Sequence, residues 1–189
     1  MTTENPQDST DSGGRLALGL VGWRHASWRG AYYPEDLLED WQLGYYANDM
    51  GCVLLDLGAL QALSAGDLAE AIEDLPAAFR FYLRVDAGAV PDPERLALLA
   101  PWLKGTLGDV STAQGGAWVP AAADPAAWCD DAGEARLLLL RLDSLDLRAL
   151  RTRLAGMAPT VEAVVFESGS LTPADLQDVR MLTELLGIA

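Results

Sequence analysis

Residues 16–34 read LALGLVGWRHASWRGAYYP, and they contain both the start of the fold and its most distinctive motif. The first six, LALGLV, form a short apolar run that is typical of a strand buried on both faces. The loop that follows contains neither a GxGxxG nor a GxxxxGKS/T sequence, so nothing there predicts a dinucleotide site or a P-loop. The stretch therefore predicts a buried strand that leads into an aromatic and cationic loop.

The rest of the chain alternates between such apolar runs and longer segments with apolar residues at helical spacing. Further strands are predicted near residues 52–57, 79–85, 136–142 and 161–166, and helices near residues 41–50, 64–75, 93–104, 147–157 and 172–186. The last helix has the clearest start, with Thr172 as N-cap, Pro173 at the first position and Asp175 at the third. Strand alternating with helix predicts an α/β fold of parallel βα units, with the helices outside the sheet.

Two stretches of the chain lack this pattern. Residues 1–14 are polar and acidic, which predicts a disordered tail ahead of a single domain over residues 15–189. Residues 105–133 are rich in Gly, Ala, Pro and Asp and have no clear period. We expect this second stretch to be mostly irregular, with one short strand near residues 107–110.

The charge balance excludes several classes of partner. The chain has 28 Asp and Glu against 13 Lys and Arg, a net charge of −15, so we expect it to bind neither nucleic acid nor an anionic membrane. It has no apolar stretch long enough to span a membrane and no signal-peptide pattern, which predicts a cytoplasmic protein. Its two separated cysteines, Cys52 and Cys129, and its one histidine form no zinc motif. We expect both thiols to be buried, and we expect no metal and no cofactor.

The aromatic loop resembles the opening of a known family. The YecE-like family, domain-of-unknown-function family 72, usually begins GTSGWxxxxWxGxFYP, and this chain fits that spacing without a gap at Gly22, Trp23, Trp28, Gly30, Tyr33 and Pro34. The resemblance continues over residues 45–81, 137–150 and 161–189 and is weakest across residues 105–133. It implies a TIM-barrel-like fold, whose site lies at the C-terminal ends of the strands.

The chain departs from this family at the ends of three later strands. Where the family usually reads VExNxTFY, residues 53–60 read VLLDLGAL, so that only Asp56 keeps a polar group there. The family's lysine after the next strand corresponds to Arg84, and the family's VEFRH corresponds to residues 164–168, which read VVFES, so that both the acid and the Arg-His pair are gone there. The resemblance therefore implies a site that has lost most of its polar residues.

The length of the chain predicts an incomplete barrel. A full TIM barrel takes about 250 residues, or roughly 31 per βα unit, so the residues after the first 14 suffice for about five or six units. We therefore expect an incomplete TIM-barrel-like parallel βα sheet with an open edge. Because unpaired strand edges invite association, a second copy or a partner chain is expected to cover that edge.

The cations and aromatic residues after the first strand are the first candidates for a binding site. Arg24, His25 and Arg29 fall within six positions of an acidic chain, and arginine suits a bidentate grip on a carboxylate or phosphate. Alternatively, Arg29 pairs with nearby acids while the other two are solvated. Trp23 and Trp28 either stack on a ligand or pack in the core.

Acidic residues at strand ends are the second set of candidates. Asp56 and Glu167 lie at or just beyond predicted strand ends, where a barrel draws its site residues, although both also suit strand-end or helix-capping roles. His25 is the only histidine, so any mechanism with a His base must use it. The weak catalytic candidates are thus His25 and Asp56. The ligand-binding candidates are Trp23, Arg24, Trp28, Arg29, Arg84 and Glu167.

Three functions remain open from the sequence. The first is a non-catalytic YecE-like protein that binds a small anionic ligand or a protein partner at the C-terminal face of the strands. The second is a metabolic enzyme that acts on a small anionic substrate through Arg24, Arg29, His25 and Asp56. The third is a structural subunit that completes a barrel with another chain. The lost polar residues favour the first.

Overall fold

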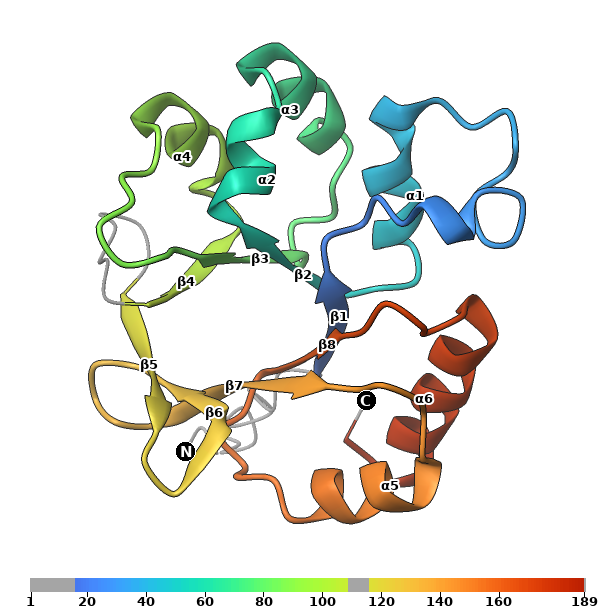
Figure 1. Ribbon diagram of the computed structural model, residues 1–189, viewed down its shortest axis with the longest axis vertical. Helices are drawn as coiled ribbons and strands as arrows, with labels where there is room; N and C mark the ends of the chain where they lie inside the picture. The colour runs from blue at the N-terminus through green and yellow to red at the C-terminus, as the bar shows by residue number, and fades with distance from the viewer. Residues whose placement is uncertain (1–15, 109–115, 189) are drawn as a thin grey trace, which may run out of the picture.

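Eight strands form one closed barrel in chain order in the computed structural model, which describes residues 16–108 and 116–188 (Figure 1). Strand β8 pairs in parallel with β1, which closes the sheet. The strands are β1 (Ala17–Val21), β2 (Cys52–Asp56), β3 (Arg80–Arg84), β4 (Leu103–Leu107), β5 (Ala117–Ala121), β6 (Asp124–Cys129), β7 (Ala135–Arg141) and β8 (Ala163–Glu167). The predicted α/β class is confirmed.

The prediction of an open, incomplete barrel is wrong. Strand β6 runs antiparallel to both β5 and β7, whereas all other neighbours are parallel. Antiparallel neighbours need only a short turn between them, and the described residues from β4 to β6 include no helix. Strands β5 and β6 therefore lie within the segment expected to be mostly irregular, and β4 begins where the predicted helix over residues 93–104 was expected to end. The barrel thus closes in fewer residues than eight βα units need.

Closure also removes the reason given for an associated second chain. Every strand of the described barrel has a neighbour on both sides, so no open edge is left for another chain to cover. Association of copies by some other surface stays a prediction, which light scattering tests. The predicted tail over residues 1–14 lies outside the described residues.

The helices lie outside the barrel. They are η1 (Ala26–Trp28), η2 (Glu39–Trp41), α1 (Gln42–Ala47), α2 (Leu57–Ala62), α3 (Ala65–Ile72), α4 (Pro93–Leu99), α5 (Leu147–Ala155) and α6 (Pro173–Leu185). Helices α1 to α4 follow the first three strands and α5 and α6 the last two, which leaves β4, β5 and β6 without a following helix (Figure 1). At α6 the predicted start is confirmed, since Thr172 and Asp175 form a capping box. None of the described helices is long and apolar enough to cross a membrane.

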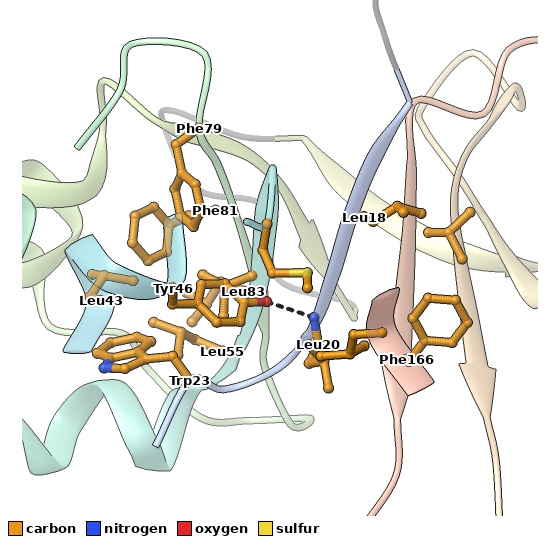
Figure 2. Close-up of a cluster of buried hydrophobic side chains, with 14 of the residues drawn as sticks. Leu18, Leu20, Trp23, Leu43, Tyr46, Leu55, Phe79, Phe81, Leu83 and Phe166 are labelled. Atoms are coloured by element: carbon orange, nitrogen blue, oxygen red, sulfur yellow. Dashed lines mark hydrogen bonds between the residues drawn. The ribbon is translucent and has the colours of Figure 1, made fainter. Parts of the chain in front are cut away.

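Side chains alternate between two cores along each strand. The outer core, between strands and helices, includes Leu18, Leu20, Phe81 and Phe166 (Figure 2). The Tyr46 hydroxyl ties this core together, because it accepts the Leu20 N–H at 2.8 Å and donates to the Cys52 carbonyl at 2.9 Å. Helix α1 is thereby fixed to β1 and β2.

The inner core fills the barrel itself, and it combines very large with very small residues. The rings of Tyr82 and Trp118 lie 5.5 Å apart inside the sheet. These large rings fit because neighbouring positions on the inner face of the barrel are occupied by glycine. A Cβ built on Gly105 would meet the Trp118 ring at 2.5 Å, and one on Gly19 would meet the Cys52 carbonyl oxygen at 2.0 Å. The interior is therefore a packed core and not a channel.

The two thiols are expected to differ sharply in reactivity. Cys52 is fully buried, and burial raises the pKa of its thiol to about 12, whereas Cys129 is only partly buried. Since the thiolate is the reactive form, titration of the native protein with a chromogenic disulfide should show one rapidly reacting thiol. Cys129→Ser should abolish this rapid reaction, and unfolding the protein should make the Cys52 thiol reactive. A fast native reaction at Cys52 would contradict the closed interior.

Candidate functional site

Four charged side chains lie at the C-terminal mouth of the barrel. Asp56, Arg84, Arg141 and Glu167 end strands β2, β3, β7 and β8. Each shares its strand face with residues of the inner core, so all four side chains point toward the barrel axis. In a barrel of this type, the C-terminal strand ends are where site residues are found.

These four residues form one continuous chain of ion pairs, the mouth network. Arg84 Nε donates to Asp56 Oδ1 at 2.5 Å, and Arg84 Nη1 donates to Glu167 Oε1 at 2.9 Å. Arg141 Nε donates to the other oxygen of Glu167 at 2.6 Å. The network crosses from β2 and β3 to β7 and β8, so two arginines and two carboxylates balance each other over the inner core.

The mouth network keeps the Glu167 carboxylate charged. Burial alone would raise the pKa of Glu167, but the hydrogen bonds from Arg141 and Arg84 outweigh it and hold that pKa below its usual value. The hydrogen bond to Asp56 raises the pKa of Arg84. Glu167 is therefore unsuited to act as a general acid near neutral pH. The mouth is also not stripped of charge, contrary to what the departures from the family implied.

An open depression adjoins the mouth network at the ends of β7 and β8. Its volume is about 360 Å³, and it is lined by Val21, Arg141, Asp143, Glu167 and Ser168 among others. The Arg141 side chain is 77% exposed, which leaves most of its donors open to solvent. Because Arg141 is already paired with Glu167 and Asp143 also lines the depression, it is a weak site for an anion.

The predicted cationic loop forms a second depression, the loop pocket, lined chiefly by Arg24, His25, Arg29, Glu39 and Gln42, with a volume of about 280 Å³. Gly22, with φ of +71°, turns the chain out of β1. Arg24 lies 6.0 Å from the centre of the Trp23 ring. The structure thus brings together the three cationic candidates that the sequence placed in one loop.

The two arginines of the loop pocket are loosely held. Arg24 contacts Glu39 at 3.7 Å, with both side chains well exposed. Arg29 donates from Nε to the Glu35 backbone carbonyl at 3.4 Å, and no described carboxylate forms an ion pair with it. The predicted alternative, a pairing of Arg29 with a side-chain acid nearby, is therefore not what the structure shows. Both guanidinium groups keep N–H donors for a ligand.

His25 lies in the loop pocket as a neutral base. Its Nε2 is 3.3 Å from the Gly22 carbonyl, and its ring packs on Trp28 at a centroid distance of 4.5 Å. Burial lowers the pKa of His25, although the contact with Gly22 opposes the change. No hydrogen bond in the described part of the chain joins His25 to Asp56, so the two catalytic candidates belong to separate clusters.

Trp23 and Trp28 support the loop pocket from inside. They are only 3% and 2% exposed, so their rings do not face solvent as stacking platforms do. Trp28 Nε1 donates to the Leu171 carbonyl at 3.2 Å, and the Tyr33 hydroxyl donates to the Trp23 carbonyl at 2.6 Å. The motif therefore fixes the loop after β1 against the segment that precedes α6.

Arg141 is the mouth residue that the candidates omitted. It follows Leu137 and Leu139 at even spacing, and both of these face the inner core, so strand alternation was the signal that could have identified it. The described residues contain no cluster of three or more His, Cys, Asp and Glu that could hold a metal ion.

Comparisons with known proteins agree with this architecture. The family model DUF72, "Protein of unknown function DUF72", matches residues 17–91. A DUF72 family protein from Thermotoga maritima is 14% identical with a TM-score of 0.57, and the match covers 89% of this chain and 99% of that chain. One from Enterococcus faecalis is 12% identical with a TM-score of 0.50, covering 93% and 99%. No curated protein sequence matches the chain.

Likenesses at this level of identity show the fold. Both alignments extend over 99% of the solved chains. The DUF72 match covers β1 to β3 and therefore the Gly-Trp motif, Asp56 and Arg84. The chain is thus similar to the DUF72 family, which is also called YecE-like, in the sequence of its first three strands and in its fold.

Proposed function

We propose that this protein binds a small anionic ligand in the loop pocket and does not transform it. The observation that carries the proposal is the convergence of Arg24 and Arg29, both with unused donors, on one depression. Arg24 contacts only the exposed Glu39, at 3.7 Å, and Arg29 forms no ion pair with a described carboxylate, so both guanidinium groups have donors that an anion can use.

The chemistry of the loop pocket defines the class of ligand. A guanidinium presents parallel N–H donors that match the two oxygens of a carboxylate or phosphate. The pocket volume of about 280 Å³ lies near the lower limit for small-molecule sites. A compact carboxylate or phosphate monoester suits it better than a nucleotide.

The enzyme alternative has less support from the geometry. Its base, His25, has no acid partner within the described residues to orient the ring, as a His–Asp pair would have. Its second group, Asp56, is held by Arg84 in the mouth network. We therefore favour binding, and an assay for turnover of any ligand found keeps the two proposals distinct.

The double variant Arg24→Ala/Arg29→Ala is expected to lose ligand binding while remaining folded. A panel of small carboxylates and phosphate monoesters, screened by thermal shift, should give a hit that raises the Tm by roughly 5–10 °C at about 100 times its Kd. The double variant should lose this rise because the anion loses both donors. Its own Tm should stay close to that of the wild type, since the Arg24–Glu39 pair is exposed.

A matched control removes the same charge elsewhere. Arg148→Ala/Arg151→Ala takes two exposed arginines from α5 and should keep the full ligand-induced rise. A panel without a hit, or a rise that survives in the Arg24→Ala/Arg29→Ala protein, would contradict the proposal. Turnover of the ligand that depends on His25 would instead favour the enzyme.

A further inference from the structure

A third depression is lined by residues of η2, α1 and α3 and of the segments beside them. Its volume is about 700 Å³, and its apolar lining includes Leu37, Trp41, Tyr45 and Ala71. Four acids also line it: Asp40 from η2, Glu70 from α3, and Glu73 and Asp74 just after α3. We call this surface the acidic groove.

The acidic groove exposes one large aromatic side chain, since Trp41 in its lining is 67% exposed. Leu38, three residues earlier and outside the lining, is 60% exposed. Trp23 and Trp28 of the loop motif are by contrast almost completely buried. An exposed tryptophan at the edge of a groove is the kind of anchor found in protein interfaces.

The charges of the acidic groove are also unmatched. Within the described ranges, none of Asp40, Glu70, Glu73 and Asp74 forms an ion pair, and the groove lining contains no arginine or lysine. Elsewhere acids do find partners, as Asp49 does with Arg180 at 3.0 Å. Four uncompensated carboxylates around one groove make its potential strongly negative, and the net charge of the chain adds to it.

We propose that the acidic groove is the docking site for a basic segment of a partner protein, in which arginine or lysine alternates with apolar residues. Its cations would be attracted to the four carboxylates, and an arginine would stack on the exposed face of Trp41. Its apolar side chains would cover Leu37 and Ala71 on the floor of the groove.

Other occupants fit the acidic groove less well. A second copy of this chain would bring another net charge of −15 against the same negative surface. A metal ion needs converging ligands, and the described residues offer no cluster of three or more. A small polyamine would satisfy the charge but leave Trp41 and the apolar floor uncovered. The proposal does not depend on the loop pocket, because a separate set of charged residues carries it.

The test is the binding of a short fluorescein-labelled peptide in which arginine alternates with leucine, followed by fluorescence anisotropy at low and high ionic strength. The triple variant Glu70→Gln/Glu73→Gln/Asp74→Asn should raise the Kd about tenfold, because it removes three of the four attracting charges. Trp41→Ala should raise it by a similar factor of roughly ten through loss of the stacking surface. High salt should weaken binding to the wild type much more than to the triple variant.

A control triple variant separates a specific groove from overall charge. Asp131→Asn/Asp178→Asn/Glu184→Gln neutralises three exposed acids away from the groove and should change the Kd by about twofold or less. If the two triple variants weakened peptide binding equally, the proposal would be overturned. It would also be overturned if spermine, at an equal concentration of positive charge, displaced the peptide and bound the Trp41→Ala variant as tightly as the wild type. Arg24→Ala/Arg29→Ala should leave peptide binding intact, which distinguishes failure here from failure of the anion proposal.

Discussion

Replacing Gly19 by alanine is expected to destabilise the barrel by about 3 kcal/mol or more, a large part of the stability of a domain of this size. Gly19 lies on the face of β1 that is turned to the barrel interior, and it pairs in register with Cys52 on β2. A Cβ there would lie 2.0 Å from the Cys52 carbonyl oxygen, a backbone atom that moves only if β2 moves. Urea denaturation followed by circular dichroism measures the loss.

Two helical glycines provide a matched control for this substitution. Gly44 in α1 and Gly58 in α2 would place a new Cβ where no atom lies within 4 Å. Alanine at either position should stabilise the protein by about 0.5–1 kcal/mol, because it reduces the freedom of the unfolded chain. If Gly19→Ala unfolded at the same urea concentration as the wild type, the barrel interior between β1 and β2 would not be as tightly packed as the structure indicates.

The sequence predicted those strands whose two faces are both covered. β1, β2, β3, β7 and β8 pack against the inner core and the outer helices, so each appears as a continuous apolar run. β5 and β6 have no helix over them, and they include exposed or polar positions such as Pro120 and Asp124. Apolar residues on only one face of a strand give a short, interrupted pattern in the sequence. The length estimate assumed a helix after every strand, so it predicted missing βα units where the chain has strands without helices.

The candidate site was predictable only in part, for a related reason. The ends of the apolar runs located Asp56, Arg84 and Glu167, and strand alternation could have added Arg141. Their pairing was not predictable, because Arg84 and Glu167 are 83 positions apart and meet only once the barrel closes. In the loop pocket, the spacing placed the cations correctly but did not reveal that Trp23 and Trp28 face inward.

Replacing Arg84 by methionine is expected to cost about 2–3 kcal/mol at neutral pH. Arg84 is the central member of the mouth network, and its side chain is only 22% exposed. Methionine keeps much of its volume but leaves Asp56 and Glu167 as two negative charges without the cation between them. Arg141→Met should cost about 1 kcal/mol or less, since that side chain is 77% exposed and, among the described residues, forms an ion pair with Glu167 alone.

The pH dependence separates this electrostatic cost of Arg84→Met from a packing defect. In the wild type the pKa of Glu167 lies below its ordinary value of 4.5, so its stabilising contribution is present above that value and is lost as the pH falls through the lower, folded pKa. In the variant the lowering by Arg84 is gone while burial still raises the pKa of Glu167. Protonation of Glu167, which still pairs with Arg141, then relieves its repulsion with Asp56, so the stability gap between the two proteins should narrow as the pH falls below about 4. Glu167→Gln added to Arg84→Met should recover part of the loss at neutral pH. A gap of constant size from neutral to acid pH would mean that the mouth network contributes through packing alone.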